Sequence, residues 1–364
     1  MVRQILALLL TISVVLSPAA CGNSVLPNRD ERQDTSTTND NNTNAGNNRS
    51  PAGRDLAGIP EYSLSAACVF GGSGTVGKLS YQMADRIFKE SDGKIAITIY
   101  PDSQLGSESE LVEAVQAGNI SMMISGPSSH VSVVPETAVL NICGLFTDVE
   151  TCNAVLAGEF YHIIDKYYES ANLKLLALVA TGFREMTSNK PVYKYEDFEN
   201  IKIRALENTY HAAYWSALGA VPVPMPFSEL HIGLKEGVVE AQDNPIPLFR
   251  SAGLFEVQKY IIMTNHIPTI ATPIMNLSLF ESMKEEYQEI IIRNMDLMQQ
   301  EVIDANNAME QEILEDLVDR GMTVIYPDGE TLQKMQAGTD AAIEEMNKNI
   351  DPVLVDRFIS AVRS

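Results

Sequence analysis

The chain has 364 residues, of which 45% are apolar, and this is enough to form two domains of ordinary size. Its formal net charge of −22 excludes binding to nucleic acid or to an anionic membrane surface through a basic field. An anionic ligand would therefore need a few positioned arginines that overcome the repulsion of the whole chain.

The first 20 residues have the pattern of a signal peptide. Arg3 precedes an apolar run, residues 5–16, which is too short to span a bilayer. Ala19 and Ala20 then precede Cys21, and this ending resembles a bacterial lipobox although Pro18 stands where that pattern prefers Leu. We predict export, removal of residues 1–20 and a lipid on Cys21 that anchors the protein outside the cytoplasm. The alternative is cleavage after Ala20 without lipid.

Residues 21–61 are predicted to form a disordered tether between the anchor and the folded body. No aromatic residue occurs between Gly22 and Glu61, and residues 39–48 read "NDNNTNAGNN". Such a polar tract has no side chains with which to form a core. The fold is therefore expected to start near Tyr62.

Strands and helices alternate in the first half of the fold. Residues 63–70, 94–100, 121–125 and 173–180 are apolar or alternating runs typical of strands. Leu79, Met83 and Ile87 mark one face of a helix. The "SESE" sequence from Ser107 to Glu110 is a capping box that opens a further helix, which Gly118 ends. This rhythm predicts an α/β protein with mostly parallel sheets covered by helices.

The second half continues the pattern. Residues 201–205 read "IKIRA", a short strand in which Lys202 and Arg204 alternate with apolar residues. Asn208 is expected to cap a helix that stops at Gly219, and "VPVPMPF" is expected to be an extended connector. Further elements are predicted as a helix capped by Ser228, a long helix opened by a capping box at Ser282 and running to about Arg320, a strand at 323–327, and two final helices.

The cysteines and histidines do not have the spacing of a metal site. The chain has no CxxC and no HExxH, and its five histidines are scattered, so we expect no metal and no metal cofactor. Cys143 and Cys152 could form a disulfide outside the cytoplasm with Cys68 left buried and free, or all three could remain free.

The sequence "GSGTVG" presents a choice between two kinds of site. Gly72, Gly74 and Gly77 fit G-x-G-x-x-G between a predicted strand and a predicted helix, which is the context of a dinucleotide-binding loop. An exported NAD-type oxidoreductase is therefore one alternative. Against it, the signal peptide sends the chain to a compartment where free NAD(H) is not normally available. The same glycines also let a backbone approach another ligand at a helix N-terminus.

Five blocks of the sequence carry a resemblance to a known family. They occur in this order: "GKIAITIYPDSQLGSESELVEAVQAG", "GFREMTSNKPV", "IKIRALEN", "LGAVPVPMPFSELHIGLKEGVVEAQDNP" and "FEVQKYIIMTNH". Together they resemble the extracytoplasmic solute receptors of tripartite ATP-independent periplasmic (TRAP) transporters, dicarboxylate-binding (DctP) type. The resemblance extends from about Tyr62 to the C-terminus.

The resemblance implies a fold and a function. Members of this family have a type II periplasmic-binding-protein-like α/β fold with two lobes, linking strands and a long helix, and they are not enzymes. They bind a small organic acid between the lobes and deliver it to membrane permease subunits. We therefore expect one lobe at 62–181 plus 267–300, another at 182–266 plus 301–364, and hinge closure around the ligand. A receptor that signals to a sensor kinase would have the same fold.

The resemblance also implies ligand-binding residues. Arg204 stands where the family has its main carboxylate-binding arginine, and a guanidinium offers a rigid two-pronged donor to a carboxylate. Arg184 matches a second arginine, or it forms a hinge salt bridge. Asn244 matches a ligand-binding amide, or it caps a turn. Phe227 matches an aromatic wall, or it belongs to the core.

Three further residues are weaker candidates for the site. Glu207 stands where members that bind sialic acid carry Asn, and it would repel an acidic group, pair with Arg204 or accept from a ligand hydroxyl or amine. Gly126 stands at a position that is acidic in those members, so ligands of that kind are not supported. Ser125 and Thr75 are candidates for contacts from the first lobe.

Overall fold

Two β-sheets organise the chain in the computed structural model, which describes residues 59–363. The first sheet has the strand order β2-β1-β3-β10-β4 and the second has the order β11-β9-β5-β8-β6-β7. The strands of the first sheet are β1 (Tyr62–Cys68), β2 (Ile95–Tyr100), β3 (Met122–Ile124), β4 (Leu173–Leu175) and β10 (Ile274–Asn276). Those of the second are β5 (Val179–Ser188), β6 (Lys202–Ala205), β7 (Val221–Pro224), β8 (Ala241–Asn244), β9 (Tyr260–Ala271) and β11 (Thr323–Ile325).

Both sheets are mixed, whereas the sequence predicted mostly parallel ones. The β1–β2, β1–β3, β6–β7, β6–β8 and β9–β11 pairs are parallel. The strands β5, β9 and β10 introduce antiparallel pairs, because the chain passes between the sheets there and re-enters in the opposite direction. The predicted strand at 173–180 is accordingly divided into β4 of the first sheet and the start of β5 of the second.

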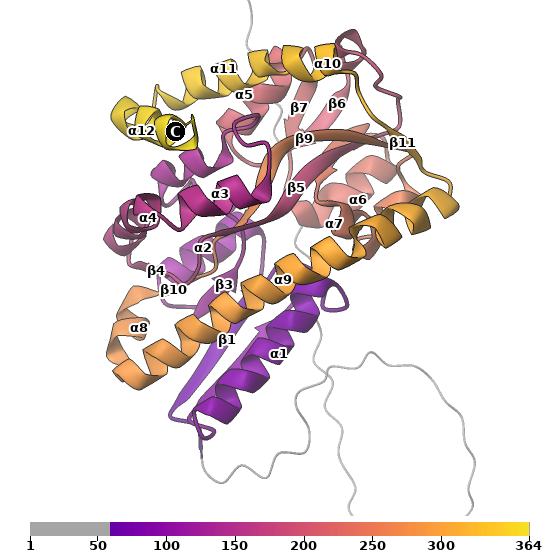
Figure 1. Cartoon of the computed structure of the whole chain (residues 1–364). Coiled ribbons are helices and arrows are strands. Elements are labelled where there is room, and N and C mark those ends of the chain that lie inside the picture. The colour runs from indigo at the N-terminus through magenta and orange to yellow at the C-terminus, as the bar shows by residue number, and fades with distance from the viewer. Residues whose placement is uncertain (1–58, 364) are drawn as a thin grey trace, which may run out of the picture. The chain divides into compact units, whose positions relative to one another are not determined.

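Helices cover both sheets (Figure 1). The α-helices are α1 (Thr75–Glu90), α2 (Glu108–Gln116), α3 (Val149–Leu156), α4 (Glu159–Ser170), α5 (Thr209–Ala217), α6 (Phe227–Lys235), α7 (Ile246–Ser251), α8 (Leu277–Ser282), α9 (Glu285–Asp319), α10 (Gly329–Lys334), α11 (Gln336–Met346) and α12 (Pro352–Arg363). Short 3₁₀ helices are η1 (Pro127–His130), η2 (Pro135–Asn141), η3 (Tyr195–Phe198) and η4 (Leu254–Glu256). Within residues 59–363 no helix combines the length and the apolar character needed to cross a membrane.

Three elements connect the two sheets. β5 follows β4 and β9 leads into β10, and the two long strands pair with each other over most of their length. The third element is α9, a single helix of 35 residues that packs on α1 beside the first sheet and on α7 beside the second (Figure 1). This arrangement brings the ends of several strands together next to the middle of α9.

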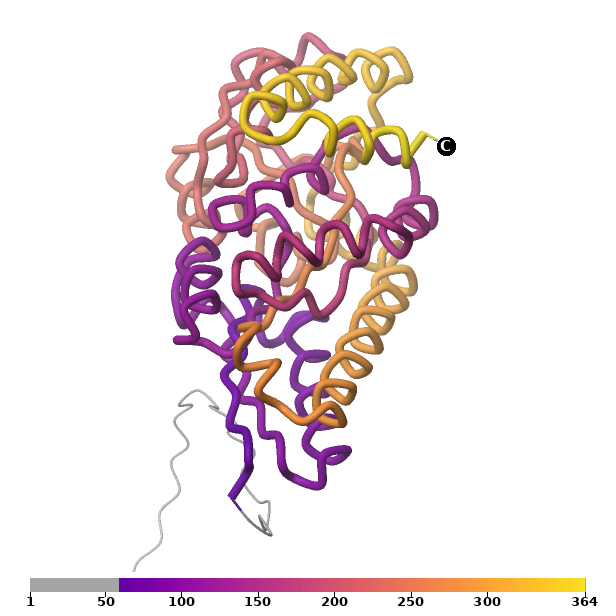
Figure 2. The backbone as a smooth tube through the Cα atoms, turned by 90° about the vertical axis from the view of Figure 1, so that its left-hand side faces the viewer, coloured from indigo at the N-terminus to yellow at the C-terminus, as the bar shows by residue number. Residues whose placement is uncertain are grey.

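Separate hydrophobic clusters support the two sheets. One lies between β1, β2, α1 and α9, and another lies beneath α5 and the second sheet. The C-terminal helices divide between the two regions, because α11 packs on α5 whereas α12 packs on α3 and η2. Figure 2 shows this yellow C-terminal segment beside both magenta and pink parts of the backbone. The helix α12 therefore lies against elements of the range predicted as the first lobe.

Local capping signals in the sequence were read correctly at two helices. The Glu110 carboxylate accepts a hydrogen bond from the backbone N–H of Ser107 at 2.9 Å, as the predicted capping box requires. The Asn208 side chain accepts from the N–H of His211 at 2.8 Å and caps α5. The segment after α5 is extended, as predicted, and forms the edge strand β7.

Three helix predictions were wrong. The cap of α6 is Pro226, not Ser228, because the helix already starts at Phe227. The cap of α9 is Lys284, because Ser282 ends the preceding helix α8 and donates its hydroxyl to the carbonyl of Leu279 at 2.7 Å. After β11 there are three helices in the described chain, not two. Ser228 thus lies within the first turn of α6, and Ser282 belongs to the neighbouring helix α8.

The sequence left open whether Cys143 and Cys152 form a disulfide, and in the structure they do not. Both cysteines are free and buried, as is Cys68. Cys143 packs in the cluster under the second sheet, whereas Cys152 on α3 packs in the cluster that also holds α12, so each thiol fills a different core. The predicted signal peptide, the lipidated Cys21 and most of the 21–61 tether lie outside the described residues.

Candidate ligand-binding site

A cavity of about 550 Å³ lies where the strand ends of both sheets meet the middle of α9. This volume is typical of sites for small molecules. Its lining includes six of the seven residues proposed from the sequence as ligand contacts, namely Arg204, Arg184, Asn244, Phe227, Ser125 and Thr75. The structure therefore brings together residues that are distributed over 170 positions of the sequence, from 75 to 244.

Arg204 supplies a buried positive charge to this cavity. It lies in β6 between β7 and β8, and only 2% of it is exposed, while Lys202 on the same strand is exposed. Its Nε donates to the carbonyl oxygen of Met225 at 2.8 Å, which fixes the side chain. Among residues 59–363, no carboxylate lies within ion-pair distance of Arg204. Its terminal nitrogens are therefore free to bind a ligand.

Arg204 stays charged although its surroundings disfavour the charge. Burial lowers the pKa of Arg204, the nearby Arg184 lowers it further, and Glu108 opposes both. A guanidinium starts from so high a pKa that it stays protonated in proteins. The cavity therefore holds a permanent cation that has a backbone carbonyl but no carboxylate partner among residues 59–363.

Arg184, by contrast, is paired within the protein. Its Nε donates to Oδ2 of Asp243 at 2.6 Å, and its terminal nitrogen donates to the backbone carbonyl of the same residue. Arg184 comes from β5 and Asp243 from the neighbouring strand β8. The sequence left open whether Arg184 binds ligand or forms a salt bridge, and the structure shows a salt bridge whose guanidinium also lines the cavity.

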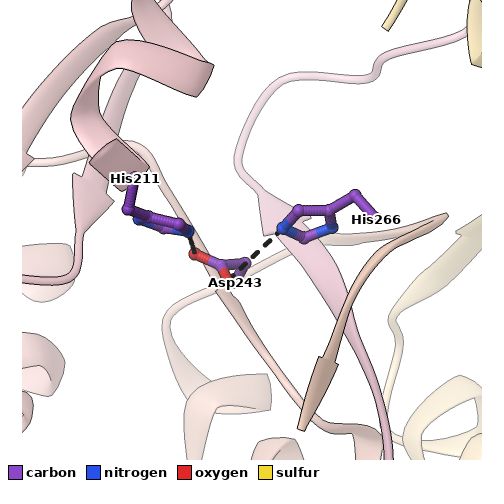
Figure 3. Close-up of side chains that lie close together, drawn as sticks. All are labelled: His211, Asp243 and His266. Atoms are coloured by element: carbon purple, nitrogen blue, oxygen red, sulfur yellow. Dashed lines mark ion pairs between the residues drawn. The ribbon is translucent and has the colours of Figure 1, made fainter. Parts of the chain in front are cut away.

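Two histidines complete the surroundings of Asp243 (Figure 3). His211 of α5 places Nε2 3.4 Å from Oδ1, and His266 of β9 places Nε2 3.5 Å from Oδ2. Burial alone would raise the pKa of Asp243, but Arg184 and the two histidines hold it well below its usual range. Burial lowers the pKa of His266, which favours its neutral form. Asp243 is thus a buried anion that holds Arg184 in place.

The His211, Asp243 and His266 cluster also has the spacing of a metal site, since its ligand atoms lie within 4.8 Å of one another. Its hydrogen bonds argue against that use. The N–H of Leu206 points at Nδ1 of His211 at 3.1 Å, and the indole N–H of Trp215 points at Nε2 at 3.2 Å. Neither ring nitrogen has a lone pair free for a metal, and the Arg184 guanidinium would repel a cation.

Asn244 presents a fixed amide to the cavity. Its Nδ2 donates to Oε1 of Gln242 at 2.5 Å, Gln242 donates to Thr187 at 2.7 Å, and Thr187 donates to Gln258 at 2.8 Å. Gln258 then donates to backbone carbonyls, which can only accept. Because this end fixes the direction of the whole chain, the Asn244 oxygen remains available as an acceptor for a ligand group.

The other side of the cavity comes from the first sheet and its helices. Thr75 is the first residue of α1 and Glu108 the first residue of α2, so the N-terminal ends of both helices face the cavity. Ser125 follows β3 directly and is buried. Burial raises the pKa of Glu108, while Arg204 and Arg184 lower it. This carboxylate is the one acidic side chain among the lining residues that the structure describes.

The "GSGTVG" loop lies at the start of α1 and lines the cavity with Gly74. A side chain at Gly77 would collide with the carbonyl oxygen of Gly71 and would lie 2.7 Å from the Cα of Gly72. The loop folds back on the first turn of the helix, and only glycine allows that approach. Local packing therefore explains why the last position of this motif is glycine.

Phe227 lines the cavity, whereas Glu207 does not. Phe227 is the first residue of α6, is half-buried and lines the cavity while it also packs against the nearby hydrophobic cluster. Phe227 therefore belongs partly to the core, and its contact with a ligand stays a prediction. Glu207 is exposed and does not line the cavity, because it lies beyond the end of β6, next to the helix cap Asn208. Its proposed direct contact with a ligand is not supported.

Sequence reasoning missed Glu108 and the partners of Arg184. Glu108 was read only as part of a capping segment, although an acidic residue at a helix start can also face a cleft. Asp243, His211 and His266 are far apart in the sequence, and a single sequence has no local signal that joins them. The one hint in the sequence was that Asp243 stands directly before Asn244, which was proposed as a ligand contact.

Comparisons with known proteins identify the family of the chain. The profile of the family described as bacterial extracellular solute-binding protein, family 7, matches residues 71–349. A solute-binding protein of Roseobacter denitrificans is 30% identical over 272 residues, which is 74% of this chain and 82% of that protein. The crystal structure of a TRAP periplasmic solute-binding protein from this organism, with bound L-galactonate, matches with a TM-score of 0.77 and 26% identity, over 84% of this chain and 100% of that one.

A second solved structure gives the same picture. A TRAP periplasmic solute-binding protein of Haemophilus influenzae with bound L-gulonate matches with a TM-score of 0.77 and 27% identity, over 82% of this chain and 99% of that one. The chain therefore belongs to the family of bacterial extracellular solute-binding proteins, family 7, and is a TRAP-type solute receptor with the two-lobed α/β fold. The oxidoreductase and sensor-receptor alternatives find no support in these matches.

Proposed function

We propose that this receptor captures a small organic acid in the cavity and delivers it to the membrane permease subunits of a TRAP transporter. The observation that carries the proposal is Arg204, a buried guanidinium that faces the cavity without a carboxylate partner. A buried charge is costly unless it is paired, and a ligand carboxylate supplies the missing partner. The acids bound in the similar Roseobacter and Haemophilus structures support this reading.

The ligand-binding roles follow from the positions of the side chains. Arg204 makes the main two-pronged contact to the carboxylate, Arg184 supports it, and the Asn244 oxygen accepts from a ligand hydroxyl group. Phe227 covers an apolar part of the ligand, while Ser125 and Thr75 contact it from the first-sheet side. Residues 62–181 with 267–300 and residues 182–266 with 301–364 act as two lobes, except that α12 packs on the first of them. The lobes close on the ligand because the closed form makes more contacts with it.

A thermal-shift screen tests this proposal. The purified protein is heated with L-galactonate, L-gulonate, succinate and other small acids, and hits are measured by calorimetry. An acid at 100 times its dissociation constant adds about 2.7 kcal/mol to the stability of the folded protein. NADH in the same assay is expected to give no shift. If no carboxylate stabilises the protein, or if NADH binds with micromolar affinity, the proposal is wrong.

We also propose that the mature protein begins at a lipidated Cys21 and is anchored outside the cytoplasm. The apolar run before Ala19 and Ala20 and the polar segment after Cys21 support this. Cell fractionation of wild type and Cys21→Ser tests it. We expect the wild type in the membrane fraction and the variant in the soluble fraction, and equal partition of the two would contradict the anchor.

A further inference from the structure

A chain of buried hydrogen bonds connects the core of the first-sheet region to the cavity. Nε2 of His130 lies 2.7 Å from the hydroxyl oxygen of Ser125, and Nδ1 of the same ring lies 2.7 Å from the hydroxyl oxygen of Tyr168. His130 and Tyr168 are fully buried and Ser125 is 3% exposed. Thr272 of the segment between β9 and β10 also reaches Nδ1, at 3.4 Å. Of these residues, Ser125 lines the cavity.

The direction of this chain follows from the groups that can accept a proton. A buried phenol must donate its O–H to an acceptor, and in the described structure Nδ1 of His130 is the acceptor that Tyr168 contacts. A neutral imidazole that accepts at Nδ1 carries its proton on Nε2, which then donates to Ser125. The Ser125 hydroxyl therefore keeps its own proton for another acceptor.

Two neighbouring serines of the same segment show the opposite behaviour. Ser128 donates its hydroxyl to Oδ1 of Asn141 at 2.9 Å, and Ser129 donates to the carbonyl of Gly126 at 2.9 Å. Both also line the cavity, but the protein itself uses their protons. Ser125 is thus distinguished from its neighbours by having a proton donor, His130, behind it and the cavity in front of it.

His130 also remains neutral, because burial lowers its pKa to about 3. An imidazole with so low a pKa is a weak base and does not take the proton from Ser125, so this Ser–His pair does not form an activated nucleophile. Hydrogen bonds in a chain polarise one another, so the Ser125 O–H becomes a stronger donor than an isolated serine.

We propose that Ser125 is a specificity-determining residue that donates a hydrogen bond to an acceptor oxygen of the bound acid, and that His130 and Tyr168 are positioning residues that aim this donor. The inference rests on the proposed function of the cavity. It assigns to the first-sheet side a neutral donor that recognises a carboxylate or carbonyl oxygen, opposite the charged donors Arg204 and Arg184.

The first test needs no ligand. Nitrogen-15 NMR of the imidazole rings reports which ring nitrogen carries the proton, and His130→Gln identifies the His130 signals among the five histidines. We expect a proton on Nε2 and none on Nδ1 in the wild-type protein. In Tyr168→Phe the donor to Nδ1 is lost, so we expect the Nδ1-protonated form to appear. A proton on Nδ1 in the wild type would reverse the chain and overturn the inference.

The second test measures binding by calorimetry with whichever of L-galactonate, L-gulonate and succinate binds the wild type most tightly. Ser125→Ala is expected to weaken binding about tenfold to a hundredfold, as the loss of a hydrogen bond to a charged group does. The control is Ser80→Ala, which also removes a buried internal hydrogen bond but lies outside the cavity lining. We expect binding within about threefold of wild type for this control. Equal affinities for Ser125→Ala and wild type would overturn the inference.

The two tests separate the inference from the proposed function. If none of the acids binds, the proposed function fails, and the tautomer of His130 still decides whether Ser125 presents its proton to the cavity. If the acids bind but Ser125→Ala has no effect, the proposed function stands and the role of Ser125 is wrong.

Discussion

The two sides of the cavity differ in how they carry polarity. The second-sheet side holds Arg184 and Arg204 on strands that flank β8, with Asp243 buried between histidines. The first-sheet side offers helix N-termini, hydroxyl groups and the single carboxylate of Glu108. One side therefore supplies fixed charge, and the other supplies mainly neutral donors. The difference indicates that the acidic group of a ligand is held by the second-sheet side.

The two arginines refine this comparison. Arg184 has a full counter-charge in Asp243, whereas Arg204 has only a backbone carbonyl. The net charge that remains for a ligand is therefore close to that of Arg204 alone. A ligand with one carboxylate would compensate this charge. Arg184, whose charge Asp243 already balances, would mainly orient the ligand.

The largest effect is expected from removing Arg204. Truncating one partner of a buried, hydrogen-bonded charge pair costs about 2–5 kcal/mol, or roughly 30-fold to several-thousand-fold in affinity. Arg204→Ala should nearly abolish binding of an acid found in the screen, as measured by calorimetry. Arg204→Lys should recover only part of it, because an ammonium group lacks the planar two-pronged geometry. Arg184→Ala should cost less than Arg204→Ala.

Circular dichroism serves as the control for this series, since a folded variant is required. If a folded Arg204→Ala variant binds the acid within about threefold of wild type, the charge on the second-sheet side is not the anchor of the ligand. The comparison between the two sides would then have to be abandoned.

A second prediction concerns stability and tests the role of Asp243. Asp243→Asn leaves the Arg184 guanidinium without its buried counter-charge, and breaking such a pair costs about 3–5 kcal/mol. We expect this loss in the free energy of unfolding, measured by urea denaturation. Asp316→Asn is a control, because Asp316 pairs with Arg320 at 2.9 Å where both side chains are far more exposed, and such a pair should contribute less than about 1 kcal/mol. Equal losses for the two variants would contradict a structural role for Asp243.

A third prediction concerns how stability depends on pH through the buried carboxyl group of Glu185. This residue is buried next to Arg184, and its carboxylate accepts from the N–H of Asn265 at 2.8 Å. Burial raises its pKa from about 4.5 to about 7. A carboxyl whose pKa is raised by folding stabilises the folded state while it is protonated. This contribution is fully present below about pH 4.5 and is lost as the pH rises through about 7.

Unfolding experiments between these pH values measure the effect. The loss for the wild type between about pH 4.5 and above pH 7 is expected to be about 3 kcal/mol from this group. In Glu185→Gln no proton is exchanged at this position, so the stability should depend less on pH by that amount. An unchanged pH dependence in the variant would show that Glu185 is not the group that titrates.

The parts of the fold that depend on nearby residues could be predicted from the sequence. The Ser107–Glu110 capping box and the Asn208 cap involve residues three positions apart, so the signal is contained in a short segment. The cap of α9 was misplaced because Ser282 belongs to α8, and the cap of α6 was misplaced because the helix already starts at Phe227. Helix boundaries of this kind are decided by neighbouring elements in the folded chain.

The candidate site likewise has one part that the sequence predicted and one part that it could not predict. Arg204 was found because its strand lies in a block that resembles a family, and the alternation alone could not separate it from the exposed Lys202. The pair formed by Arg184 and Asp243 joins residues 59 positions apart. The Ser125–His130–Tyr168 chain requires α4 to pack behind η1. Such contacts exist only once the sheets have assembled.

The long helix α9 passes the cavity at its middle and extends beyond it on both sides. Its middle is tied to β5 by the bond from Asn306 to the carbonyl of Thr181 at 2.9 Å, and it lines the cavity there. From Asn306 the helix extends about 30 Å towards its start and about 20 Å towards its end. A tilt of about three degrees about Asn306 would move the first turn of the helix by about 1.5 Å. The residues at the cavity would stay almost still. If a ligand changes the tilt of α9, the displacement would therefore be largest at the two ends of the helix and smallest at the cavity.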